Sequence, residues 1–81
     1  MSATAQRTLQ ILAEVADTDR VLTEPDLPLF DLGLLDSLGI VTLITRFAEE
    51  FNVDISPAEF EREDWSTPAE IVEDMERRVD A

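Results

Sequence analysis

The segment from about Arg20 to Asp36 constrains the fold of this chain more than any other part. Pro25, Pro28 and Gly33 prevent a continuous helix there, because proline removes a backbone N–H and both residue types weaken helix interiors. Eight of its residues are nevertheless apolar, namely Val21, Leu22, Leu27, Leu29, Phe30, Leu32, Leu34 and Leu35. So apolar a segment is expected to pack against a core, and long irregular loops in compact domains are often functional.

The residues before this segment predict an amphipathic helix. Apolar side chains recur there every three or four positions, at Leu9, Leu12, Val15 and Ala16. Ser2 or Thr4 can cap the start of the helix. It should end near residues 17–19, because Asp and Thr prefer turns and caps to helix interiors.

The strongest helical pattern runs from Ser37 to about Phe51, with Asp36 or the serine itself as its N-terminal cap. The residues that form its apolar face are Ile40, Leu43, Ile44, Phe47 and Phe51. On a helical wheel Leu38 lies about 160° from the centre of that face, Thr45 about 140° and Val41 about 100°. Leu38 and Val41 therefore predict a small apolar docking patch on the solvent side.

Two similar motifs predict two further helix starts. Residues 56–59 (Ser-Pro-Ala-Glu) and 67–70 (Thr-Pro-Ala-Glu) each form a capping box with Pro at the first helical position. The first should open a short helix ending near Arg62. The second should open a final helix with one apolar face, made of Ile71, Val72, Met75 and Val79. Trp65 lies between them and is expected to anchor the core.

These elements predict an all-α fold in a single domain over residues 1–81. We expect a small four-helix bundle, with three main helices, one short helix and a long ordered loop after the first helix. A chain of 81 residues, 44% of them hydrophobic, can build one modest core but hardly a walled active-site cavity.

Composition excludes several classes of function. The chain has no Cys and no His, which excludes disulfides, thiolate ligands, zinc sites of these residues and Ser–His relays. Its formal net charge of −13 disfavours nucleic acid and anionic membranes as partners and favours a basic protein surface. No apolar run approaches the roughly 20 residues of a membrane span, and the start lacks a signal peptide. We expect a cytoplasmic monomer.

The acidic residues predict neither a metal site nor catalysis. An EF-hand loop needs a Gly at its sixth and a Glu at its twelfth position, and no window of the sequence offers both. Asp31 and Asp36 flank Gly33 in an apolar loop, where burial can raise the pKa of a carboxyl group. Such aspartates more often cap turns and helices. The acids are therefore interpreted as a solvated face, and the chain as a non-enzyme with no catalytic or metal-binding residues.

Ser37 allows two interpretations from the residues alone. It is an ordinary N-terminal cap in the first, and the chain would then be a small acidic protein-interaction module. In the second it bears a phosphate ester, since the free N–H groups and dipole of a helix N-terminus suit such a group.

A resemblance to a known family favours the second interpretation. Residues 29–38 (Leu-Phe-Asp-Leu-Gly-Leu-Leu-Asp-Ser-Leu) resemble the phosphopantetheine attachment motif of the acyl and peptidyl carrier proteins. The resemblance covers roughly residues 9–79. Within that superfamily, Gly39 and residues 59–68 (Glu-Phe-Glu-Arg-Glu-Asp-Trp-Ser-Thr-Pro) are similar to the D-alanyl carrier family.

The resemblance implies a mechanism. A phosphopantetheinyl transferase would attach 4′-phosphopantetheine from coenzyme A to Ser37, and the thiol of this arm would hold an acyl or aminoacyl group as a thioester. The chain would be a freestanding carrier, loaded by a separate adenylating enzyme and discharged to a downstream acyl or aminoacyl transferase. The partner-docking residues would be Asp36, Leu38, Val41, Thr45 and Glu49.

The D-alanyl-like motifs favour an aminoacyl cargo and leave its pathway open. One option is D-alanine for teichoic acid. The other is an amino-acid or acyl unit for a polyketide or nonribosomal peptide assembly line, as in antibiotic biosynthesis. All six basic residues are Arg, a composition that hints at a GC-rich genome and slightly favours the second option.

Overall fold

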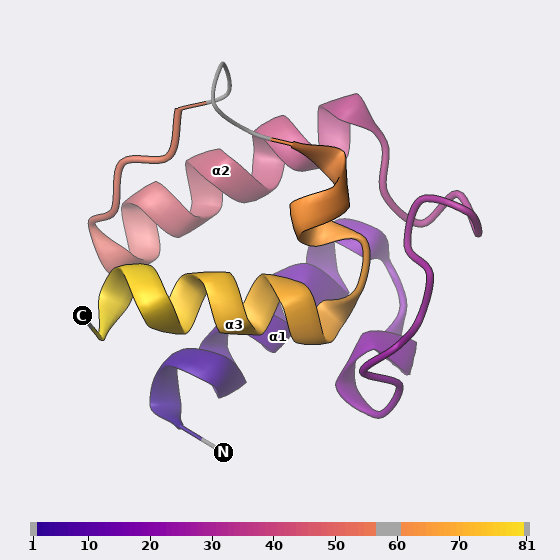
Figure 1. Ribbon diagram of the computed structural model, residues 1–81, viewed down its shortest axis with the longest axis horizontal. Coiled ribbons are helices and arrows are strands. Elements are labelled where there is room, and N and C mark those ends of the chain that lie inside the picture. The colour runs from indigo at the N-terminus through magenta and orange to yellow at the C-terminus, as the bar shows by residue number, and fades with distance from the viewer. Residues whose placement is uncertain (1, 57–60, 81) are drawn as a thin grey trace.

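The computed structural model describes residues 2–56 and 61–80, and these residues form an all-helical fold (Figure 1). The elements in chain order are the α-helix α1 (Ala3–Ala16), the 3-10 helix η1 (Asp19–Leu22), α2 (Ser37–Phe51), the 3-10 helix η3 (Arg62–Trp65) and α3 (Pro68–Val79). Helix α1 contacts both α2 and α3. Figure 1 shows α2 along one side of the α1–α3 pair, with the segment between η1 and α2 passing around one end.

The all-α prediction is confirmed, but the number of α-helices differs. The described residues hold three α-helices and two 3-10 helices instead of four α-helices. The short helix expected from Ser56 to Arg62 falls mostly on residues 57–60, which lie outside the described residues. After them, Arg62–Trp65 makes one 3-10 turn only. It stops there because Thr67 precedes a proline and is extended, at φ −133° and ψ 159°.

Side-chain caps fix the helix ends that the sequence predicts. The Ser2 hydroxyl accepts a hydrogen bond from the Ala5 N–H (3.0 Å) at the start of α1. The Thr67 hydroxyl accepts one from the Glu70 N–H (3.3 Å) at the start of α3. Helix α1 ends at Ala16 because the next residue, Asp17, has a left-handed backbone (φ 56°), close to the expected end.

The long segment before α2 packs on the core, as expected. Four of its apolar side chains are buried, namely Val21, Leu27, Leu29 and Leu35. The Leu29 N–H donates to the carbonyl oxygen of Ser66 (3.0 Å), and the Ala69 N–H donates to that of Pro25 (3.0 Å). These two bonds tie the segment to the end of η3 and to the first turn of α3.

Trp65 anchors the core, as predicted, through an acidic residue that the sequence analysis did not single out. Its buried ring lies edge-on to Phe47, with ring centroids 5.7 Å apart. The indole N–H donates to Oδ2 of Asp74 (2.8 Å). The Asp74 carboxylate, itself buried, also accepts hydrogen bonds from Arg77 (2.8 Å) and Arg78 (3.1 Å).

This network predicts a pH-dependent contribution to stability. Burial alone would raise the pKa of Asp74, but hydrogen bonds from Arg77, Trp65 and Arg78 outweigh it and lower the pKa below its usual value. A carboxyl group with a lower pKa in the folded state stabilises the fold fully above its unfolded pKa, about 3.9. That stabilisation is lost as the pH falls through the folded pKa.

We expect Asp74→Asn to lower the free energy of unfolding at pH 7 by about 1–3 kcal/mol, because it removes the charge that two guanidinium groups bond. The difference between the two proteins should shrink as the pH falls below about 4 and through the lowered pKa of the folded wild type, where its carboxyl group becomes protonated. Urea unfolding of both proteins from pH 7 to pH 2.5 measures it. A difference that stays constant over that range would contradict the assignment.

Thr8 on α1 is a second polar side chain in the core. It is fully buried, and its hydroxyl has no hydrogen-bond partner in the described part of the chain. An unsatisfied buried hydroxyl costs about 1–3 kcal/mol in protein mutational data. We therefore expect Thr8→Val, which keeps the shape, to raise the free energy of unfolding by about 1 kcal/mol or more. Urea unfolding tests this, and a loss of stability would refute it.

Candidate functional site

Ser37 is the first residue of α2, and its side chain is exposed. No other described residue makes a hydrogen bond to its hydroxyl. The cap of the helix is Asp36, which has an extended backbone and accepts a hydrogen bond from the Gly39 N–H at Oδ1 (2.8 Å). This resolves the choice that the sequence left open between Asp36 and Ser37. The serine hydroxyl is therefore not needed to cap the helix.

The first turn of α2 leaves backbone donors beside that hydroxyl. The Ile40 N–H donates to the Asp36 carbonyl oxygen (2.9 Å), and the cap occupies the N–H of Gly39. The N–H groups of Ser37 and Leu38 have no acceptor among residues 2–56 and 61–80. Unpaired N–H groups at the positive end of a helix favour an anionic group. The site thus fits a phosphate ester on the serine oxygen.

The loop before Ser37 is held by its own backbone. The N–H groups of Leu34 and Leu35 both donate to the carbonyl oxygen of buried Leu29, at 2.9 and 3.2 Å. The turn passes through Gly33, whose φ of 72° lies in the left-handed region that glycine adopts without strain. The serine is therefore presented from a fixed segment.

Gly39 lets the cap and the core approach each other closely. A Cβ atom at this position would lie 3.1 Å from Cδ2 of Leu35 and 3.4 Å from Oδ1 of Asp36. Leu35 is buried, and the Asp36 oxygen is the one that accepts the Gly39 N–H. The absence of a side chain thus keeps the cap bond and the buried leucine together.

Four of the five predicted docking residues share the outer face of α2, and the fifth, Asp36, caps its start. Leu38, Val41, Thr45 and Glu49 follow one another at steps of three or four residues and are all exposed. Leu38 is 75% exposed and Val41 51%, which confirms that both point away from the core. The Thr45 hydroxyl donates to the Val41 carbonyl oxygen (3.0 Å), which keeps its polar atom close to the helix. The expected apolar patch therefore exists, with an acidic residue further along the helix.

The structure adds an exposed leucine that the helical pattern did not predict. Leu32, in the loop before the serine, is 47% exposed. Its N–H donates to the Pro28 carbonyl oxygen (3.1 Å), so its backbone is fixed. In the same loop Phe30 lies under the guanidinium of Arg62, whose Cζ is 4.3 Å from the ring centroid. Sequence periodicity cannot show either contact, because the loop has no repeat.

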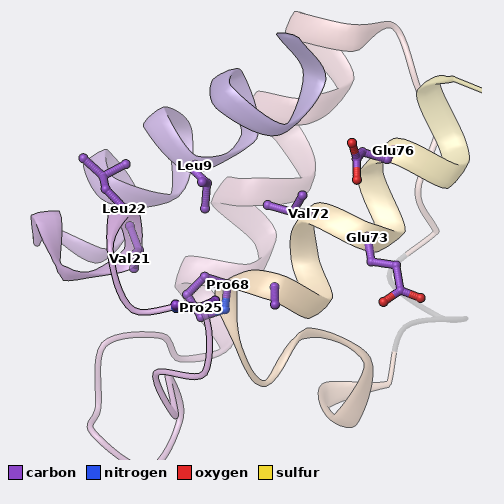
Figure 2. A pocket seen from close by; sticks show the side chains of 9 residues that line it. Leu9, Val21, Leu22, Pro25, Pro68, Val72, Glu73 and Glu76 are labelled. Atoms are coloured by element: carbon purple, nitrogen blue, oxygen red, sulfur yellow. The ribbon is translucent and has the colours of Figure 1, made fainter. Parts of the chain in front are cut away.

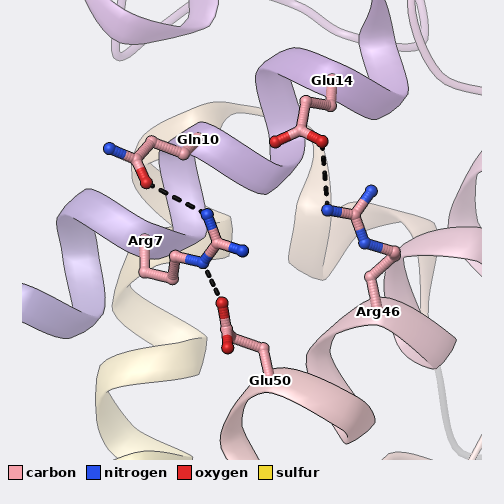
Figure 3. A network of polar contacts seen from close by, with 5 residues as sticks. All are labelled: Arg7, Gln10, Glu14, Arg46 and Glu50. Carbon is pink, nitrogen blue, oxygen red and sulfur yellow. Dashed lines mark hydrogen bonds and ion pairs between the residues drawn. The ribbon is translucent and has the colours of Figure 1, made fainter.

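Basic side chains are largely neutralised. Five of the six arginines form ion pairs with carboxylates, namely Arg7, Arg20, Arg46, Arg77 and Arg78. Figure 3 shows two of these pairs joining α1 to α2, Arg7 with Glu50 and Arg46 with Glu14. The net charge of −13 is therefore expressed at the surface mainly through carboxylates.

Neither a metal site nor a membrane helix is found in the described ranges. Residues 2–56 and 61–80 contain no group of three or more His, Cys, Asp or Glu side chains placed to hold a metal ion. The helices among them are all too short or too polar to cross a membrane.

The chain is similar to known proteins over most of its length. Residues 6–75 match the model of a family described as "Phosphopantetheine attachment site". The D-alanyl carrier protein of Bacillus licheniformis is 40% identical over 70 residues, which cover 86% of this chain and 90% of that protein. The D-alanyl carrier protein of Listeria monocytogenes serotype 4b is 37% identical over 71 residues, 88% of this chain and 91% of that one. That of Bacillus cereus strain B4264 is 34% identical over 76 residues, 94% and 96%.

Proposed function

Because the chain belongs to the carrier-protein family that has a phosphopantetheine attachment site, we propose that the hydroxyl of Ser37 is the attachment point. The chain is a carrier and not an enzyme, and its cofactor is covalently attached 4′-phosphopantetheine. One observation supports Ser37 most strongly. Its exposed hydroxyl is free among the described residues, because Asp36 caps the helix in its place.

The residues around Ser37 have separable tasks in this proposal. Asp36 holds the first turn of α2 in place through its bond to Gly39. The N–H groups of Ser37 and Leu38, unpaired among the described residues, would stabilise the phosphate of the arm. The arm supplies a thiol that holds the cargo as a thioester, a group that a chain without Cys lacks.

We place the partner enzymes on the outer face of α2. Leu38 and Val41 offer the apolar contact, Thr45 lies between them and Glu49, and Glu49 attracts basic groups. A phosphopantetheinyl transferase, an adenylating enzyme and a downstream acyl or aminoacyl transferase would use this face in turn. The first enzyme acts on the Ser37 hydroxyl and the other two act on the thiol of the arm that Ser37 carries, so all three approach the same end of α2 and their contacts overlap.

The cargo we propose is an amino acid, with D-alanine first. Three relatives at 34–40% identity are D-alanyl carrier proteins, and each match spans at least 86% of this chain. The test supplies the phosphopantetheinylated chain with ATP and the D-alanine-activating enzyme of one relative. We expect the intact mass to rise by one alanyl group with D-alanine, and more slowly with L-alanine.

A negative result in that assay separates the remaining possibilities. A chain that accepts the arm but no D-alanine would be a carrier for another unit, as on a polyketide or nonribosomal peptide assembly line. A chain that never accepts the arm would be an acidic interaction module in which Ser37 carries nothing.

The acidic charge near the outer face of α2 predicts that the rate of loading by the adenylating enzyme depends on ionic strength. Raising the ionic strength from 0.1 to 1 M shortens the Debye length from about 10 to about 3 Å. The rate of loading by the adenylating enzyme should fall over this range, mainly through slower association. Glu49→Gln should weaken the salt dependence, whereas Asp19→Asn on η1 should not. A rate that stays flat for the wild type would mean that the charge does not guide docking.

A further inference from the structure

An apolar groove of about 420 Å³ lies on a part of the molecule that the proposed function does not use. Its lining comes from α1, η1, the loop after η1 and α3, and includes Leu9, Leu22, Ala69, Val72, Glu73 and Glu76. Figure 2 shows Leu9 and Val72 pointing toward one another across it, with Leu22 near one end. None of the lining residues belongs to α2.

Leu22 is the least expected member of this lining. It is 44% exposed, one of four large apolar side chains so exposed in the described part of the chain. Of the other three, Leu38 and Val41 lie on the outer face of α2, and Leu32 lies in the loop that leads to Ser37. The attachment site thus has an apolar surface near it already, and the exposure of Leu22 needs another explanation. A groove with an exposed leucine at its end can bind an apolar side chain.

The charge of the groove selects its occupant. Glu73 and Glu76 line it on the α3 side, and no basic residue is among the described residues that line it. The only arginine on the adjoining η1, Arg20, is paired with Glu24 at 2.8 Å. A second copy of this chain would bring its own charge of −13 to the contact, which opposes self-association. A helix with apolar side chains on one face and basic side chains beside them would match both the apolar lining and the two glutamates.

We infer that this groove is a second docking surface, which binds a basic amphipathic helix of a partner protein. The apolar side chains of that helix enter between Leu9, Leu22 and Val72, and its Lys or Arg side chains pair with Glu73 and Glu76. Because α2 contributes nothing to the groove, a partner held here leaves Ser37 free. The carrier can then stay with one protein while the enzymes of the arm come and go.

The probe is a 14-residue synthetic peptide with Leu at helical positions i, i+3, i+4 and i+7 and Lys at most others. It is titrated into the ¹⁵N-labelled full chain at 0.1 M salt while the backbone amide signals are followed. We expect the largest shifts at Leu9, Leu22, Ala69 and Val72. Peptides with Glu in place of Lys, or Ser in place of Leu, should not bind. Largest shifts at residues 38–45 would overturn the inference.

Matched variants sharpen the test. Leu22→Ser should weaken peptide binding about tenfold, as the loss of an interface anchor does. Leu32→Ser removes an equally exposed leucine outside the groove and should leave binding unchanged. Glu73→Gln should weaken binding, whereas Glu63→Gln on η3 should not. Equal effects within either pair, or a dimer of the chain that disappears in Leu22→Ser, would refute a basic partner helix. Ser37→Ala should bind normally, so this test stands apart from the attachment proposal.

Discussion

Ser37→Ala should abolish attachment of phosphopantetheine and leave the fold intact. The transferase reaction needs the serine oxygen as its acceptor, so the expected loss is complete. The stability cost should stay within about 0.5 kcal/mol, because the residue is exposed and the cap belongs to Asp36. Intact mass after incubation with coenzyme A and a phosphopantetheinyl transferase measures attachment, and urea unfolding measures stability.

Ser66→Ala is the matched control. It removes a hydroxyl from the junction between η3 and α3, where the side chain donates, among the described residues, only to the backbone carbonyl oxygens of Arg62 and Glu63. This variant should be modified like the wild type. If the Ser37→Ala chain still gains the mass of the arm, the attachment point lies elsewhere, and peptide mapping would then locate it.

Asp36 allows the two tasks of this helix start to be told apart. Asp36→Ala removes the acceptor of the Gly39 N–H and should cost about 0.5–2 kcal/mol of stability, as other lost caps do. Ser37→Ala should cost much less. The sequence could not assign these tasks, because Asp and Ser are both favourable caps and only the backbone conformation shows which residue precedes the helix.

Local periodicity predicted the faces of α2 well. Leu38 and Phe47 differ in the direction they take around the helix, and the 3.6-residue repeat alone places one outward and one inward. The structure confirms both, at 75% and 0% exposure. The direction of a side chain around a single helix can be predicted from the sequence, because the helical backbone fixes it.

Features that depend on contacts between distant segments escaped sequence analysis. The bond from Trp65 to Asp74 needs η3 to fold back on α3, and the groove at Leu22 needs α1 and α3 to lie together. The sequence did contain one signal for the bond between Trp65 and Asp74. Asp74 stands beside Met75 and three residues after Ile71 on the apolar face of α3, a position where an acid is costly unless it is paired.

Phe47→Ala should have the largest effect on stability of the changes considered. The Phe47 ring is fully buried and packs edge-on to Trp65. Its centroid lies 6.1 Å from that of the Phe51 ring. Its removal leaves a cavity among these rings, and such truncations cost about 3–5 kcal/mol. A domain of 81 residues has a free energy of unfolding of about 4–12 kcal/mol in all, so this loss removes a large share of it. Phe47→Leu, with a smaller loss, keeps the comparison measurable by urea unfolding.

Leu38→Ala is the counterpart on the opposite face of the same helix. At 75% exposure, Leu38 should contribute less than about 0.5 kcal/mol to stability. As an anchor for partner enzymes, its truncation should weaken recognition by the transferase or the adenylating enzyme by more than about 1 kcal/mol, a fivefold or larger fall in kcat/KM. Phe47→Leu should show the reverse, with lower stability and near-normal kcat/KM under conditions where it is folded. A Leu38→Ala chain that is loaded at the wild-type rate would remove Leu38 from the docking face, because its exposure would then serve no partner.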